Sequence, residues 1–254
     1  MSTLPSGRGP RPLVLALVAL GVMVALSLAL LVLPGVRSVL PLSSDCRVTV
    51  GEDSVALDTD EAQDAATLAA ADVRRGRPLT DTVAALTDSF DEEDARLLAL
   101  ALTGRSEEAL TCTHGGNDEG ETDELDRRGL TARAAAVRRD LQQAFGPQRL
   151  GGFAPEGVST GHQPGSAHYD GRAIDVFHRP VNRANQVRGW AMAHYLVAHA
   201  ERLSVETVIY DGRIWTARRS FQGWRDYSPD TEGRTRQVAA ILEHRDHVHV
   251  DVAD

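Results

Sequence analysis

The chain has 254 residues, which is enough for one sizeable domain and an accessory segment. It contains 27 Arg and no Lys against 36 acidic residues, and its net charge at pH 7 is −9. No acidic residue precedes Asp45, so the acidic excess lies in the rest of the chain. A surface of this charge argues against a protein that binds nucleic acid through its phosphates.

Residues 13–34 form an apolar run in which Ser27 is the one polar side chain. A helix of this length spans about 30 Å, the thickness of the hydrocarbon core of a bilayer. A cleaved signal peptide and a buried core helix are the alternatives, but the run is long and no small-x-small cleavage site follows it. Arg8 and Arg11 precede the run and predict that residues 1–12 are cytoplasmic. The sequence therefore predicts a single transmembrane helix in the cell membrane, with the rest of the chain extracytoplasmic.

The two cysteines, Cys46 and Cys112, would both lie in an oxidising compartment, which favours a structural disulfide. Neither has another Cys or a His at zinc-finger spacing. The stretch "CRVTVGEDSVAL" alternates polar and apolar residues, as expected for one hairpin. Three later stretches each begin with Thr or Asp, which can cap a helix, and continue with apolar residues at helical spacing. The pattern predicts that residues 44–112 form a small helical segment clasped by the disulfide.

Residues 113–128 are acidic and rich in glycine, which is typical of a linker. The domain expected after it, residues 129–254, mixes helical stretches with the strand patterns "RAIDVF" and "HVHVDV" and with an Asp-Gly hairpin in "VETVIYDGRIWTA". Strands and helices do not alternate regularly. We therefore expect an α+β fold with a mainly antiparallel C-terminal sheet and flanking helices, preceded by the transmembrane helix and the small helical segment.

The two strand patterns each place polar side chains on one face. In "RAIDVF" the alternation separates Asp175 from aliphatic neighbours, and in "HVHVDV" it puts His247 and His249 opposite three valines. His168 lies seven residues before Asp175. Catalytic zinc sites use three protein ligands, often imidazoles with a carboxylate, and leave one position open for water. His168, Asp175 and His249 would supply such a set.

Residues near this candidate zinc site could supply the rest of a hydrolytic reaction. Zinc lowers the pKa of a bound water, and a carboxylate nearby can then act as general base. Asp246, three residues before His249, is the candidate base, and His247 could hydrogen-bond a developing oxyanion. His162 could support the site or lie in a solvated loop, and His244 could simply cap a short helix. A structural alternative stays open, in which two strands carry polar faces and no metal.

The motifs carry a resemblance to a known family. "SAHYDGRAID" resembles the S-x-H-x-x-G-x-A-x-D motif, and "DHVH" the H-x-H motif, of zinc D-Ala-D-Ala peptidases. That superfamily groups D-Ala-D-Ala carboxypeptidases, lysostaphin-type enzymes and the hedgehog signalling domain. The resemblance covers roughly residues 145–254 and implies a hedgehog or D-Ala-D-Ala peptidase-like fold. It also implies Zn²⁺ as cofactor, His168, Asp175 and His249 as zinc ligands, and Asp246 as the base.

Ser166 and Arg172, both inside the first motif, are the candidate substrate-binding residues. One position departs from the family. Its members commonly carry an Arg in a G-Y-R segment before the first motif, where it polarises the scissile carbonyl or holds the substrate carboxylate. This sequence reads "GGFAP", with Ala154 at that place, and Arg149 or Arg172 could substitute. Loss of such a donor can lower the rate by a factor of about 100 to 1,000.

The sequence therefore predicts a membrane-anchored, extracytoplasmic zinc metallopeptidase. Its expected partner is the peptidoglycan stem peptide, whose bonds a zinc-activated water would hydrolyse in the manner of a D-Ala-D-Ala carboxypeptidase or an endopeptidase. The membrane would be contacted through the N-terminal helix, and no nucleic acid is expected. The alternative is a non-catalytic zinc-containing domain that binds cell wall or a protein, and Ala154 favours it.

Overall fold

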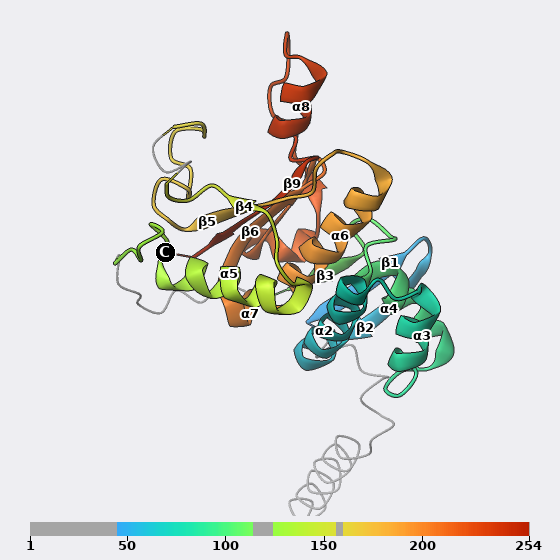
Figure 1. Cartoon of the computed structure of the whole chain (residues 1–254). Helices are drawn as coiled ribbons and strands as arrows, with labels where there is room; N and C mark the ends of the chain where they lie inside the picture. The colour runs from blue at the N-terminus through green and yellow to red at the C-terminus, as the bar shows by residue number, and fades with distance from the viewer. Residues whose placement is uncertain (1–44, 114–123, 156–159, 254) are drawn as a thin grey trace, which may run out of the picture. The chain divides into compact units, whose positions relative to one another are not determined.

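Two antiparallel sheets and the helices around them make up the part of the chain that the computed structural model describes, residues 45–113, 124–155 and 160–253 (Figure 1). All these residues belong to one compact unit, residues 44–254. The strand pairs among the described residues are antiparallel throughout. The fold is therefore α+β.

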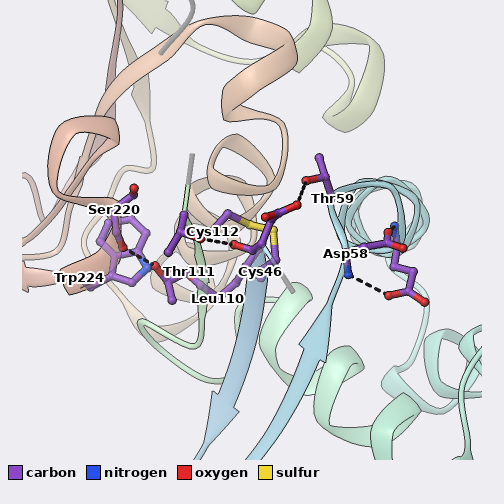
Figure 2. Close-up of a disulfide and its surroundings, with 11 residues drawn as sticks. Cys46, Asp58, Thr59, Leu110, Thr111, Cys112, Ser220 and Trp224 are labelled. Atoms are coloured by element: carbon purple, nitrogen blue, oxygen red, sulfur yellow. Dashed lines mark hydrogen bonds between the residues drawn. A yellow bond between two sulfur atoms is a disulfide. The ribbon is translucent and has the colours of Figure 1, made fainter. Parts of the chain in front are cut away.

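The smaller sheet has the order β2-β1-β3 and consists of β1 (Cys46–Val50), β2 (Asp53–Leu57) and β3 (Leu110–Cys112). β1 and β2 are the hairpin that the alternation indicated, with Gly51 in its turn at φ +65°. β3 pairs with the other edge of β1, so that Cys46 lies directly opposite Cys112 and forms a disulfide with it (Figure 2). The predicted disulfide is confirmed.

Three helices between β2 and β3 complete this N-terminal part: α2 (Thr59–Arg75), α3 (Leu79–Leu86) and α4 (Glu92–Leu102). Asp58 caps α2 in a capping box with Glu61, and Asp91 caps α4 by accepting the Asp94 N–H. Apart from Asp72, the buried residues of α2 are all alanine. The small side chains allow α2 to pack closely against α6 (Arg183–Ala198).

The larger sheet has the order β4-β5-β9-β6-β7-β8. Its strands are β4 (Leu150–Gly151), β5 (Ala173–Phe177), β6 (Val205–Tyr210), β7 (Arg213–Thr216), β8 (Arg225–Asp226) and β9 (His247–Val252). The remaining helices are α5 (Ala132–Phe145), α7 (Ala200–Leu203), a 3₁₀ helix (Ala217–Gln222) and α8 (Arg236–Leu242). β9, the last strand of the chain, lies between β5 and β6 in the middle of the sheet.

α6 joins the two parts of the chain. It contacts β6 and β9 of the larger sheet on one side and α2 and α4 on another (Figure 1). Residues 189–198 of α6 are all buried as a result. A helix buried on every side does not show the one-sided apolar stripe of a surface helix.

A single hydrophobic core runs through both parts, from Val48 and Leu110 to Trp190, Val248 and Val250. Polar contacts reinforce it next to the disulfide (Figure 2). The indole N–H of Trp224 donates to the Leu110 carbonyl at 2.8 Å, and the Thr111 hydroxyl donates to the Ser220 carbonyl at 3.4 Å. Residues 45–112 therefore pack as an integral layer against the C-terminal part.

The predicted fold class was wrong in two respects. It began with a transmembrane helix, but none of the helices among the described residues is long and apolar enough to cross a membrane. The apolar run at residues 13–34 and residues 1–12 lie outside the described residues. The fold class also treated residues 44–112 as helical, whereas these residues include the complete smaller sheet. The pairing of β1 with β3 joins segments more than 60 residues apart, as the 66-residue separation of the cysteines shows, and local periodicity carries no signal for it.

Candidate metal centre

Two neighbouring strands of the larger sheet carry the polar residues of the candidate site. In the register of β5 and β9, Asp175 lies opposite His249 and Phe177 lies opposite His247. The alternate residues of both strands, such as Val176 and Val248, lie in the hydrophobic core. The site is therefore built on the face of the sheet opposite the core.

His168, Asp175 and His249 bring one ligand atom each to a common point. His168 Nε2 lies 3.2 Å from Asp175 Oδ1 and 3.1 Å from His249 Nδ1, and His249 Nδ1 lies 3.2 Å from Asp175 Oδ1. The three residues are only 1%, 7% and 8% exposed. Two ligands of a tetrahedral zinc ion are about 3.3 Å apart, because each lies about 2.0–2.1 Å from the metal. Two imidazole nitrogens and a carboxylate oxygen at these separations fit a zinc ion.

The backbone selects which nitrogen of His168 faces this point. The ring Nδ1 donates to the carbonyl oxygen of Gly152 at 2.8 Å, so in the neutral ring Nε2 keeps its lone pair for a metal. Gly152 has φ +80°, and a Cβ at this residue would lie 2.3 Å from Cε1 of His168. Only glycine allows this approach without displacing the imidazole.

Asp175 and His249 form a charged pair in the absence of metal. Burial acts to raise the pKa of Asp175, but the contacts of its carboxylate with His168 and His249 hold this pKa well below its ordinary value. Burial acts to lower the pKa of His249, but Asp175 and Asp251 raise it to about 9. The Nε2 of His249 lies 3.5 Å from Asp251 Oδ2, which orients the ring with Nδ1 toward Asp175. A metal ion at this point would therefore displace a proton from His249.

Asp246 lies beside the ligand cluster, immediately before β9, and is buried. Its Oδ1 accepts from Nδ1 of His247 at 2.7 Å, and its Oδ2 accepts from Nε of Arg179 at 2.6 Å. Burial acts to raise the pKa of Asp246, but these two partners lower it below its ordinary value. Nε2 of His247 in turn lies 3.7 Å from Asp175 Oδ1. An ionised carboxylate is thus linked through one imidazole to the candidate ligand cluster.

Two further histidines border the cluster. The ring of His162 stacks on His168 with centroids 3.9 Å apart, and His162, His168 and Asp175 can each present a ligand atom within 4.8 Å of the others. The ring of His244 lies 4.5 Å from that of His247, and burial lowers the pKa of His244 to about 3. The sequence did not assign either histidine to the site, because the spacing of a residue in a loop does not show which strand it will lie beside.

The two predicted substrate-binding residues have different positions. Ser166 Oγ lies 3.4 Å from the backbone N–H of His168, in the turn that carries this ligand. Arg172 lies at the opposite end of β5 from Phe177, where its Nη1 donates to the Val252 carbonyl at 2.9 Å. The structure thus places Ser166 next to the ligand cluster and Arg172 away from Asp246.

Arg179 is the site residue that the sequence analysis missed. It follows β5, contacts Asp246, and its guanidinium carbon lies 4.2 Å from the centroid of the Phe177 ring. No sequence motif indicated that Arg179 would contact Asp246, because this contact depends on the path of the backbone after β5.

A family model described as VldE, C-terminal domain, matches residues 126–239, somewhat less than half of the chain. The matched range contains His168 and Asp175 and ends before Asp246 and His249. No curated protein and no solved structure gave a match.

Proposed function

We propose that the protein is a zinc-dependent peptidase that hydrolyses D-Ala-D-Ala-type stem peptides of peptidoglycan. The observation that carries this proposal is the convergence of three buried ligand atoms at 3.1–3.2 Å beside the ionised carboxylate of Asp246. The resemblance of both motifs supports it, and the match to the VldE C-terminal domain covers the first of these motifs.

In this proposal His168 holds zinc through Nε2, Asp175 through Oδ1 and His249 through Nδ1. Bound zinc supplies Lewis acidity, which polarises the scissile carbonyl and lowers the pKa of water. The other roles belong to the protein. The register of β5 and β9 fixes the ligand geometry, and the Gly152 carbonyl fixes the ring of His168.

Asp246 moves the proton. As the oxygen of water bonds to the carbonyl carbon, Asp246 accepts one proton of this water, and it returns that proton to the amine when the C–N bond breaks. Arg179 and His247 keep Asp246 ionised before the reaction. Because the Nδ1–H of His247 donates to Asp246, Nε2 can donate to a developing oxyanion only when the ring is an imidazolium.

The disulfide supports an extracytoplasmic compartment for this proposal. Disulfides persist in oxidising compartments, so the link between Cys46 and Cys112 supports an extracytoplasmic location for the peptidase. This is also where peptidoglycan is assembled and remodelled.

A second function is a non-catalytic domain that keeps the zinc and binds wall peptide. Ala154 favours it, because no guanidinium occupies the place where the related peptidases carry one. The test that separates the two is hydrolysis of a D-Ala-D-Ala-terminated pentapeptide by the zinc-loaded protein and by Asp246→Asn. The peptidase should release D-Ala and lose about 100-fold or more of its rate in Asp246→Asn with zinc retained. Retained zinc without D-Ala release in the wild type would favour the binding domain.

A further inference from the structure

Arg179 lies at the solvent side of the candidate site. Its Nε donates to Oδ2 of the buried Asp246 at 2.6 Å, while its own side chain is 42% exposed and that of Asp246 only 7%. The guanidinium carbon lies 4.2 Å from the centroid of the Phe177 ring. The ion pair and the aromatic ring together hold the guanidinium plane in place.

The outer edge of this guanidinium is available for a ligand. An arginine has five N–H donors, and the contact with Asp246 uses the Nε donor. The two Nη groups donate no hydrogen bond to any residue in the described part of the chain. A carboxylate accepts two parallel N–H bonds from such a fork, which gives both energy and orientation.

Acidic side chains near the site would repel the carboxylate of a ligand unless a cationic side chain binds it. Asp175 and Asp246 both place a buried carboxyl group at the site. Arg172 is engaged at the far end of β5, with its Nη1 on the Val252 carbonyl and its Nη2 3.4 Å from Asp170. Arg179 thus presents a guanidinium that can receive a negative charge beside Asp246.

We infer that Arg179 binds the free C-terminal carboxylate of the substrate and that the site therefore acts on the last peptide bond of a stem peptide. This inference rests on the proposed function. The terminal carboxylate lies one residue beyond the scissile carbonyl, and Arg179 is the charged group next beyond Asp246. Arg179 is thus a specificity-determining residue that selects a carboxypeptidase reaction over cleavage of an internal bond.

The test measures binding, so that it does not depend on turnover. Two phosphinate isosteres of D-Ala-D-Ala, one with a free carboxylate and one with a C-terminal amide, are titrated calorimetrically into the zinc-loaded full chain. The wild type should bind the acid at least ~10-fold more tightly than the amide. Arg179→Gln should bring this ratio close to one, and Arg179→Lys should keep part of it. Arg183→Gln is the matched control, because Arg183 pairs with Glu107 instead.

A ratio near one in the wild type, or a ratio that survives in Arg179→Gln, would overturn the inference, as would binding of neither compound. If Arg179 only positioned Asp246, both affinities would change together and the ratio would stay. The proposed function is judged separately by D-Ala release. Acid-selective binding without release would reject the peptidase and leave Arg179 as a carboxylate-binding residue.

Discussion

The carbonyl oxygen of Gly152 accepts a hydrogen bond from Nδ1 of His168 at 2.8 Å, and the α-carbon of Gly152 lies so near this ring that a Cβ would be 2.3 Å from Cε1. The loop after β4 thereby fixes both the tautomer and the position of a candidate metal ligand that is carried by a different loop. Zinc affinity should therefore depend on a residue that is not itself a ligand.

Gly152→Ala should weaken zinc binding by about 10- to 100-fold, because the new methyl group must displace the imidazole of His168. Competition with a chromophoric chelator measures this affinity. Gly165→Ala is the matched control, since Gly165 has φ +76° but nothing within 4 Å of its Cβ position. Equal zinc affinity in Gly152→Ala and Gly165→Ala would contradict the role assigned to Gly152.

Removal of the disulfide should lower the free energy of unfolding by about 4 kcal/mol in the chain-entropy model, because the bond closes a loop between residues 66 positions apart. Denaturant unfolding of the Cys46→Ala/Cys112→Ala double variant measures the change. The variant should unfold at a lower denaturant concentration, and adding a reductant should affect the wild type alone. An unchanged unfolding midpoint would show that the strand pairing of β1 with β3 suffices by itself.

Stability should fall as the pH drops from about 6.5 to 4, and His194 should account for about 3 kcal/mol of the loss. Burial lowers the pKa of His194 to about 4. Its neutral ring donates from Nδ1 to the Ala101 carbonyl and accepts the Ala109 N–H at Nε2. The unfolded chain therefore binds a proton at a pH where the folded chain does not, and acid favours unfolding.

Urea unfolding of the wild type and of His194→Gln across this pH range checks the assignment. The variant should be less stable at pH 7 and should lose less stability on acidification. Its remaining pH dependence should reflect His178 and His199, whose pKa values burial lowers to about 4. A pH profile parallel to that of the wild type would contradict the role assigned to His194.

Local periodicity was enough to predict most residues of the candidate site. Alternation in "RAIDVF" and "HVHVDV" reflects the pleat of a strand, so it placed Asp175 and His249 on polar faces without knowledge of the sheet. The structure adds that the two strands are neighbours in register, a long-range fact that no short segment encodes. The contact of Arg179 with Asp246 is of the same kind, because it depends on how the chain turns after β5.

The fold was harder to predict for the same reason. No local pattern indicated that β3 would join β1, or that α6 would be buried on every side between the larger sheet and α2 and α4. Residues 44–112 therefore looked like a separate helical segment, although they share one core with the C-terminal part. Composition could not reveal this shared core, since alanine-rich helices are compatible with either arrangement.

We expect His168, Asp175 and His249 to hold one zinc ion together. The most direct measurement is the metal content of the purified protein beside its His249→Ala variant, with Arg183→Gln as a surface control. We predict near-stoichiometric zinc in the wild type and the control, and its loss in His249→Ala. A wild type that holds no zinc after supply of the metal and removal of the excess would contradict the claim and reduce the cluster to a buried Asp–His hydrogen-bond network.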